Sequence, residues 1–118
     1  MGASFKDLVV WQRSVQLTTE IYRLSASFPP YERFGLTNQV RRASVSIASN
    51  IAEGYGRSTK GEYLQSLGYA RGSLCEVQTQ LIIATNLGFC PNKEAETVER
   101  LSADVSRMLI ALMKKLRE

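Results

Sequence analysis

The fold is decided by residues 67–84, which read LGYARGSLCEVQTQLIIA. Apolar side chains recur here at alternating steps of three and four, at Leu67, Ala70, Leu74, Val77, Leu81 and Ala84. This spacing places them all on one side of an α-helix, as in coiled coils. We therefore expect a helix that begins after a cap at Ser58 or Thr59, ends by Gly88, and packs its apolar stripe against other helices.

Three further stretches show the same helical period. The first covers about 7–27 and is ended by Pro29 and Pro30. The second runs from a cap at Thr37 to the Gly54-Tyr55-Gly56 segment, and the last runs from a cap at Asn92 to the end of the chain. Four amphipathic helices with short connections bury their stripes by packing together. The sequence thus predicts an all-α, antiparallel up-and-down four-helix bundle, with residues 1–118 as one domain.

The apolar positions predict which side of each helix faces the core. In the first helix they form two neighbouring stripes, Leu8, Trp11, Val15 and Tyr22 beside Leu17, Ile21, Leu24 and Phe28. In the second they are Leu36, Val40, Ala43, Ile47, Ile51 and Gly54, and in the last Val98, Leu101, Val105, Met108, Leu112 and Leu116. We expect these positions to supply the core.

The composition is typical of a soluble globular protein, with 44% hydrophobic and 22% charged residues. No run approaches the roughly 18 uncharged apolar residues that a membrane span requires. Asp7 and Gln12 interrupt the apolar run near the start, and no signal-peptide cleavage site follows it. We expect a cytoplasmic protein that has no membrane partner.

The chain contains no histidine and two cysteines, Cys75 and Cys90. The cysteines lie about 22 Å apart along a continuous helix, whereas a disulfide needs Cα atoms within about 7 Å. Two reduced, partly buried thiols are therefore expected. Without histidine the chain lacks the commonest metal ligand and the commonest general base. We expect no metal, no cofactor and no catalytic residues, and hence no enzymatic activity.

The second and third helices carry unusual polar and small positions. A stripe beside the apolar face of the second helix contains serine, amide and charged side chains, and the third helix contains two glycines four residues apart. Glycine inside a helix costs up to about 1 kcal/mol relative to alanine, so a pair of them predicts close packing. Either these positions pack helices within one chain, or they form a hydrated subunit interface. The positions are Gln39, Ser46, Asn50, Glu53, Gly68, Gly72 and Glu76.

Positive charge is in modest excess, with 15 Lys and Arg against 11 Asp and Glu. Residues 37–57 contain three arginines and one glutamate, half of the net charge of +4. One guanidinium group can donate two parallel hydrogen bonds to phosphate oxygens, so a basic stretch of this kind indicates nucleic-acid binding. The candidate phosphate-binding residues are Arg41, Arg42, Arg57, Lys60 and Arg71. As an alternative, Arg42 and Arg71 pair with Glu53 or Glu76 within the polar stripe.

Four segments together resemble one protein family. They are FKDLVVWQ at 5–12, the 28–36 loop FPPYERFGL, the long match QVRRASVSIASNIAEG at 39–54, and ARGSLCE at 70–76. These are similar to the motifs of the small bundle proteins encoded by intervening sequences within 23S ribosomal RNA genes. The resemblance covers nearly the whole chain. A related branch comprises the accessory proteins of diversity-generating retroelements, which are associated with nucleic acid and a reverse transcriptase.

The resemblance implies an up-and-down four-helix bundle that assembles as a homopentameric ring. It implies no catalytic activity, and it makes RNA the expected nucleic-acid partner. The leading hypothesis is thus a small oligomeric protein that binds RNA through a basic surface. The alternative is a scaffold that docks a protein partner through aromatic side chains near the helix ends, for which Tyr31, Phe34, Tyr55 and Tyr63 are the candidates.

Overall fold

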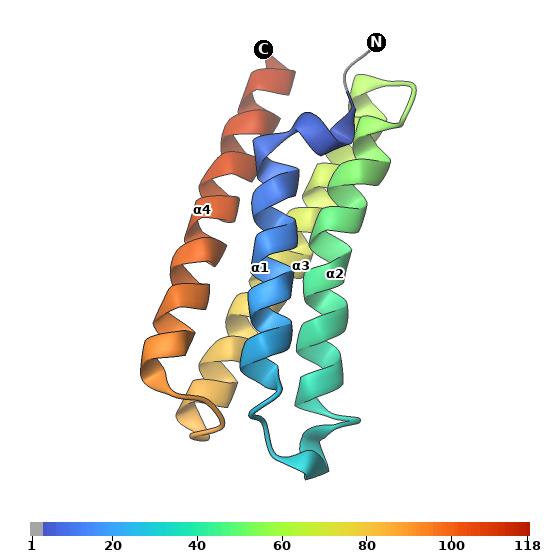
Figure 1. Ribbon diagram of the computed structural model, residues 1–118. Helices are drawn as coiled ribbons and strands as arrows, with labels where there is room; N and C mark the ends of the chain where they lie inside the picture. Colours follow the sequence, from blue (N-terminus) through green and yellow to red (C-terminus); the bar gives the residue numbers. More distant parts are fainter. Residues whose placement is uncertain (1–3) are drawn as a thin grey trace.

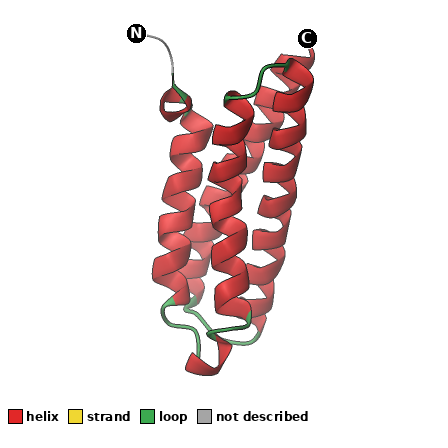
Figure 2. Cartoon of the chain, turned by 90° about the vertical axis from the view of Figure 1, so that its right-hand side faces the viewer, coloured by secondary structure: helices red, strands yellow, loops and turns green. Residues whose placement is uncertain are grey.

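Four long helices run up and down in one bundle, as predicted (Figure 1). The computed structural model describes residues 4–118, so positions 1–3 of the predicted domain lie outside the described residues. The elements are η1 (Phe5–Asp7), α1 (Val9–Ser25), η2 (Pro30–Glu32), α2 (Leu36–Tyr55), α3 (Lys60–Asn86) and α4 (Asn92–Arg117). Between residues 4 and 118 every element is helical, and short loops join the helices at the two ends (Figure 2).

The core follows the predicted stripe of α3 without exception. Each of its six positions is at most 2% exposed. The stripe of α2 is confirmed from Val40 to Gly54, whereas Leu36 is half-buried. These residues lie on adjacent turns, so α2 and α3 pack along their full length, and α1 and α4 complete the bundle (Figure 1).

Of the two stripes predicted for the first helix, one is buried, whereas the other packs against the core only at Leu8 and Trp11. Leu17, Ile21, Leu24 and Phe28 are buried, but Val15 is 39% exposed and Tyr22 is 43% exposed. In α4 the core continues through Leu109 and Met113, while Met108, Leu112 and Leu116 are only partly buried. A helix that contacts two neighbours buries a face wider than one stripe, and an apolar residue just outside that face stays exposed.

The N-terminal cap predicted for α3 is confirmed, whereas the caps predicted for α2 and α4 are wrong. Thr59 caps α3, since its hydroxyl accepts a hydrogen bond from the Glu62 N–H at 3.1 Å. The predicted Thr37 cap is wrong, because α2 begins at Leu36 and its N–H donates to Glu32 Oε1 at 2.9 Å. The predicted Asn92 cap is also wrong, because Pro91 precedes the first helical residue and no side chain caps α4. The Glu32 carboxylate, which lies outside α2, therefore accepts a hydrogen bond from a free backbone N–H at the start of this helix.

Gly68 and Gly72 of α3 do not pack against another helix within the chain. A Cβ atom added at Gly68 or Gly72 would meet no heavy atom within 4 Å, so the prediction that these glycines pack closely within one chain is wrong, and the alternative, a subunit interface, stays a prediction. The tight position is Gly54 in α2, where an added Cβ would lie 2.8 Å from Ser66 Cβ and 3.0 Å from Tyr63 Cδ1. Because α2 and α3 approach closely at Gly54, a side chain at this position would press on α3.

Both cysteines are free, as expected, but their surroundings differ. Cys90 is buried, whereas Cys75 is exposed rather than partly buried. None of the described helices is long and apolar enough to span a bilayer.

Candidate nucleic-acid interface

The polar stripe of α2 meets α3 in a small hydrogen-bonded seam. The Ser73 hydroxyl donates to Ser46 Oγ at 3.0 Å, and Asn50 Nδ2 donates to the Ser46 carbonyl oxygen at 2.8 Å and to its hydroxyl oxygen at 2.9 Å. Gln39 and Glu76 lie exposed on the same two helices. Part of the predicted polar set is thus paired inside one chain, and the rest faces solvent.

Arg41 is held by α1 rather than extended into solvent. Its Nε donates to Ser25 Oγ at 2.8 Å, and its Nη2 donates to the Tyr22 carbonyl oxygen at 3.2 Å. The guanidinium carbon also lies 4.7 Å from the centre of the Tyr22 ring, in cation–π contact. These three contacts make Arg41 a link between α1 and α2.

The other four predicted cations are exposed but do not form one patch. Arg57 pairs with Glu53 at 3.0 Å. Arg42 lies one helical turn before Ser46, which bonds to α3, so Arg42 is on the side of α2 that faces α3. Arg71 lies two turns before Gln78, which lines a hollow between α3 and α4, so Arg71 is on the side of α3 that faces α4. Within residues 4–118 neither arginine pairs with a carboxylate, so the predicted pairing of Arg42 and Arg71 with Glu53 or Glu76 is wrong. Lys60 is exposed at the start of α3.

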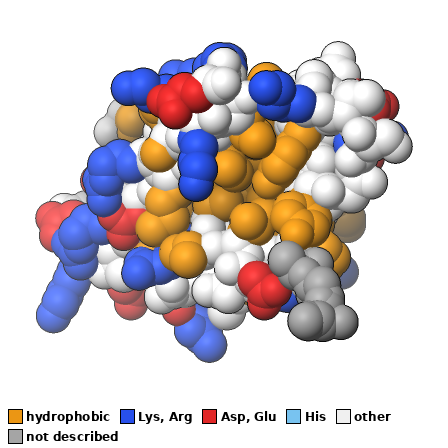
Figure 3. All heavy atoms as spheres, turned by 90° about the horizontal axis from the view of Figure 1, so that it is seen from above, with side chains coloured by type: hydrophobic (Ala, Val, Ile, Leu, Met, Phe, Trp, Pro, Cys, Tyr) orange, Lys and Arg blue, Asp and Glu red, His pale blue; other side chains and the backbone are white. Residues whose placement is uncertain are grey.

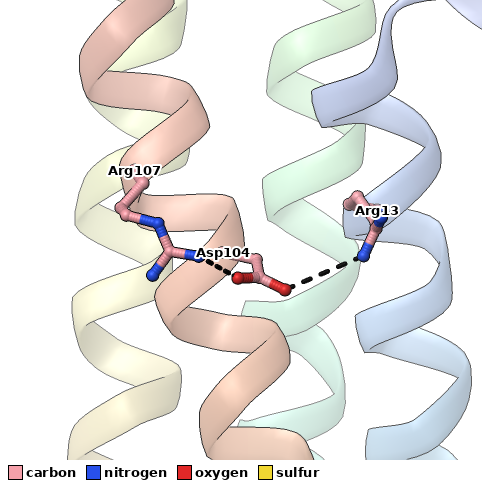
Figure 4. A network of polar contacts seen from close by, with 3 residues as sticks. All are labelled: Arg13, Asp104 and Arg107. Carbon is pink, nitrogen blue, oxygen red and sulfur yellow. Dashed lines mark hydrogen bonds and ion pairs between the residues drawn. The ribbon is translucent and has the colours of Figure 1, made fainter.

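The structure gathers a different set of arginines along the side formed by α1 and α4. Arg23, Arg100 and Arg107 line two adjoining surface hollows between these helices. Arg13 reaches Asp104 from α1 at 3.7 Å, and Arg107 contacts the other oxygen of the same carboxylate (Figure 4). Viewed along the bundle, many Lys and Arg side chains lie toward the left, which is the side of α4, with Asp and Glu side chains among them (Figures 1 and 3).

Sequence reasoning missed this set because its members come from opposite ends of the chain. Arg100 and Arg107 are seven residues apart, so two helical turns bring them to one face of α4. That spacing was a usable signal. The sequence contained no such signal for the partner helix, because only the packing of α1 against α4 shows that Arg13 and Arg23 lie on the same side as Arg100 and Arg107.

Two titratable groups are shifted by their surroundings. Burial raises the pKa of the Tyr63 phenol, and the neighbouring Tyr55 raises it further. The pKa of the Cys90 thiol is raised by burial, although a contact with the Thr85 hydroxyl opposes this, and Glu94 adds to the rise. Both shifts favour the neutral form of the group, and a neutral thiol is a poor nucleophile. Among the residues that the structure describes, no cluster of His, Cys, Asp and Glu could hold a metal ion.

Comparison with known proteins gives one family and one fold. The sequence profile of a family described as 23S rRNA-intervening sequence protein matches residues 6–111. The chain is similar to a crystal structure of a protein of unknown function from the S23 ribosomal protein family of Bacteroides thetaiotaomicron. The TM-score is 0.83 at 20% identity, over 90% of this chain and 99% of that chain, and a likeness at this identity concerns the fold. No curated protein matches the sequence.

Proposed function

The chain belongs to the 23S rRNA-intervening sequence protein family, and from this premise we propose that it is a non-enzymatic, self-associating bundle that binds RNA. The observation that supports the RNA-binding part is the number of exposed Lys and Arg side chains on the side of α4, where Asp and Glu side chains lie among them (Figure 3). Exposed guanidinium groups position a phosphate backbone without reading its sequence. In this proposal the protein acts in the cytoplasm.

Self-association supplies what one subunit lacks, since the net charge of one chain is only +4. A ring repeats each basic surface once per subunit, and the family resemblance implies a ring of five. The surface that suits the subunit contact is an apolar strip between α1 and α2, which surrounds a hollow of about 320 Å³. Its exposed members include Val15 and Val45, with Ala48 and Ala52 between them. Apolar strips of this kind mark protein contacts.

A protein-docking scaffold is the second candidate, and one observation favours it. Phe34 is 85% exposed and Tyr31 is 77% exposed, both in the connection between α1 and α2. Exposed aromatic side chains are typical anchors of protein interfaces. The other two candidate anchors are less available, since Tyr55 and Tyr63 pack edge to face with ring centres 6.2 Å apart.

The salt dependence of RNA affinity separates these two functions. Fluorescence anisotropy with a labelled single-stranded ribosomal RNA fragment would measure the dissociation constant between about 50 and about 200 mM salt. Phosphate contacts release counterions, so log K falls with log salt by about 0.7 for each contact with a single strand. A steep slope supports the RNA-binding function. Absence of binding at about 50 mM salt refutes it and leaves the scaffold.

A further inference from the structure

We propose that the groove between α1 and α4 is the track that holds the phosphate backbone of an RNA strand. This inference rests on the RNA-binding function proposed above and assigns it to a surface that the sequence did not indicate. The track is defined by four arginines, Arg13 and Arg23 of α1 and Arg100 and Arg107 of α4.

The groove is long and open rather than a closed pocket. It consists of two hollows of about 280 Å³ and about 590 Å³, which adjoin because Glu20 and Thr97 line both. Its lining on α4 extends from Glu94 to Arg107. At 1.5 Å per residue this stretch is about 20 Å long. A groove of this length accommodates several nucleotides of a single strand, whereas one small anion would leave most of it empty.

Three arginines and three carboxylates line the two hollows, and the guanidinium groups keep unused donors. Arg100 makes one weak contact, from Nη2 to Thr97 Oγ1 at 3.4 Å, and pairs with no carboxylate within residues 4–118. A guanidinium group has five N–H donors, so Arg107, which donates one of them to Asp104, keeps most of its donors free. The three lining carboxylates are Glu20, Glu94 and Asp104, and Arg13, which reaches Asp104 from α1 without lining either hollow, is the fourth arginine beside them.

The carboxylates orient the arginines without blocking them. Asp104 lies between Arg13 and Arg107 and contacts both, which holds the two guanidinium groups on either side of the groove (Figure 4). Arg107 and Arg23 remain more than two-thirds exposed in their pairs. Exposed ion pairs contribute about 0–1 kcal/mol, and phosphate oxygens compete readily for such arginines.

The lining also indicates how the strand is held. The floor is aliphatic, formed by Leu24, Val98 and Leu101, and no aromatic ring lines the two hollows. Base stacking on aromatic rings is therefore not available in the groove. Binding through the backbone alone tolerates any sequence.

The test compares two double variants that remove the same charge from different sides. The groove variant combines Arg100→Gln with Arg107→Gln and so removes two arginines of the groove. The matched control combines Arg42→Gln with Arg71→Gln and removes two exposed arginines elsewhere. A third variant, Glu20→Gln, removes a carboxylate that lines both hollows. Each is measured by anisotropy with a single-stranded ribosomal RNA fragment, a uridine homopolymer and polyglutamate, and circular dichroism and light scattering check the fold and the assembly.

We expect the groove variant to bind RNA roughly tenfold or more weakly, with a salt slope lower by about 1.4 for the two lost contacts. The control should stay within about twofold of the unaltered protein. Glu20→Gln should bind roughly threefold more tightly, a gain that misfolding cannot produce. The ribosomal fragment and the homopolymer should bind alike.

Three results would overturn the assignment. Equal RNA binding by the groove variant and the control would place the site elsewhere while leaving the RNA-binding function intact. Polyglutamate binding as tight as RNA binding, and lost in the groove variant, would assign the groove to acidic proteins. Absence of RNA binding by the unaltered protein would refute the proposed function and the groove together.

Discussion

Arg41 and Arg42 are neighbours in the sequence, yet they lie on different sides of α2. One residue turns an α-helix by about 100°, so Arg41 faces α1 and Arg42 faces the side shared with α3. Arg41 bonds Ser25 and the Tyr22 backbone and stacks on the Tyr22 ring, whereas Arg42 is exposed. The same residue type thus has a structural role at one position and a free charge at the next.

This difference predicts unequal costs of substitution. Arg41→Gln should lower the free energy of unfolding by about 1–2 kcal/mol, because two hydrogen bonds and a cation–π contact are lost. Arg42→Gln, the matched control, should change it by no more than about 0.5 kcal/mol. Urea titration followed by circular dichroism measures both. Equal stability of the two variants would show that Arg41 does not link α1 to α2.

The glycines provide a second prediction, with opposite signs at two positions. Gly54→Ala should destabilise the protein by about 1–3 kcal/mol, because its methyl group would press on Ser66 and Tyr63. Gly72→Ala should stabilise the chain by up to about 1 kcal/mol, since the site is open and alanine favours helix. Thermal unfolding checks both. If Gly72→Ala instead destabilises the assembly and not the isolated chain, Gly72 lies at a subunit contact.

At the scale of the element, α3 shows how a helix start is fixed by one side chain. The Thr59 hydroxyl accepts from the Glu62 N–H and donates to the Glu62 carboxylate. Thr59→Ala should therefore cost about 1 kcal/mol of stability. Ser58→Ala, one residue earlier, is the control and should have little effect. A larger loss in the Ser58 variant than in the Thr59 variant, seen by urea unfolding, would contradict the assigned cap.

The elements also show which part of the fold was predictable. The apolar stripe of α3 is buried at all six predicted positions, so the period alone identified the apolar core there. The period failed in α1, where Val15 and Tyr22 continue the apolar pattern but stay exposed. It also failed at the start of α2, because the Glu32 carboxylate that replaces a cap belongs to the preceding turn. Local periodicity identifies helices, whereas contacts between elements decide which residues are buried.

The candidate site was less predictable than the fold for the same reason. The predicted arginines cluster in sequence, but α2 and α3 direct Arg41, Arg42 and Arg71 to three different sides. The arginines that do share a side, such as Arg13 and Arg107, are far apart in sequence. A cluster in the sequence of a helical protein becomes a patch only if its members share a face.

At the scale of the whole molecule, the apolar strip between α1 and α2 predicts how subunits associate. Val45→Lys should dissociate the assembly, because it introduces a charge into an apolar contact. Val9→Lys adds the same charge at another exposed valine, outside this strip, and should leave the assembly unchanged. Light scattering gives the mass of each variant. An assembly that survives Val45→Lys would place the subunit contact on another surface, such as the one that contains Gly68 and Gly72.

The central claim is that an assembly of these bundles binds RNA by charge. The most direct measurement is light scattering on the purified protein with and without a single-stranded ribosomal RNA fragment, at about 50 and about 200 mM salt. We expect a mass of several subunits that increases by bound RNA at low salt and returns to that of the protein alone at high salt. A mass unchanged by RNA at both salt concentrations would contradict the claim.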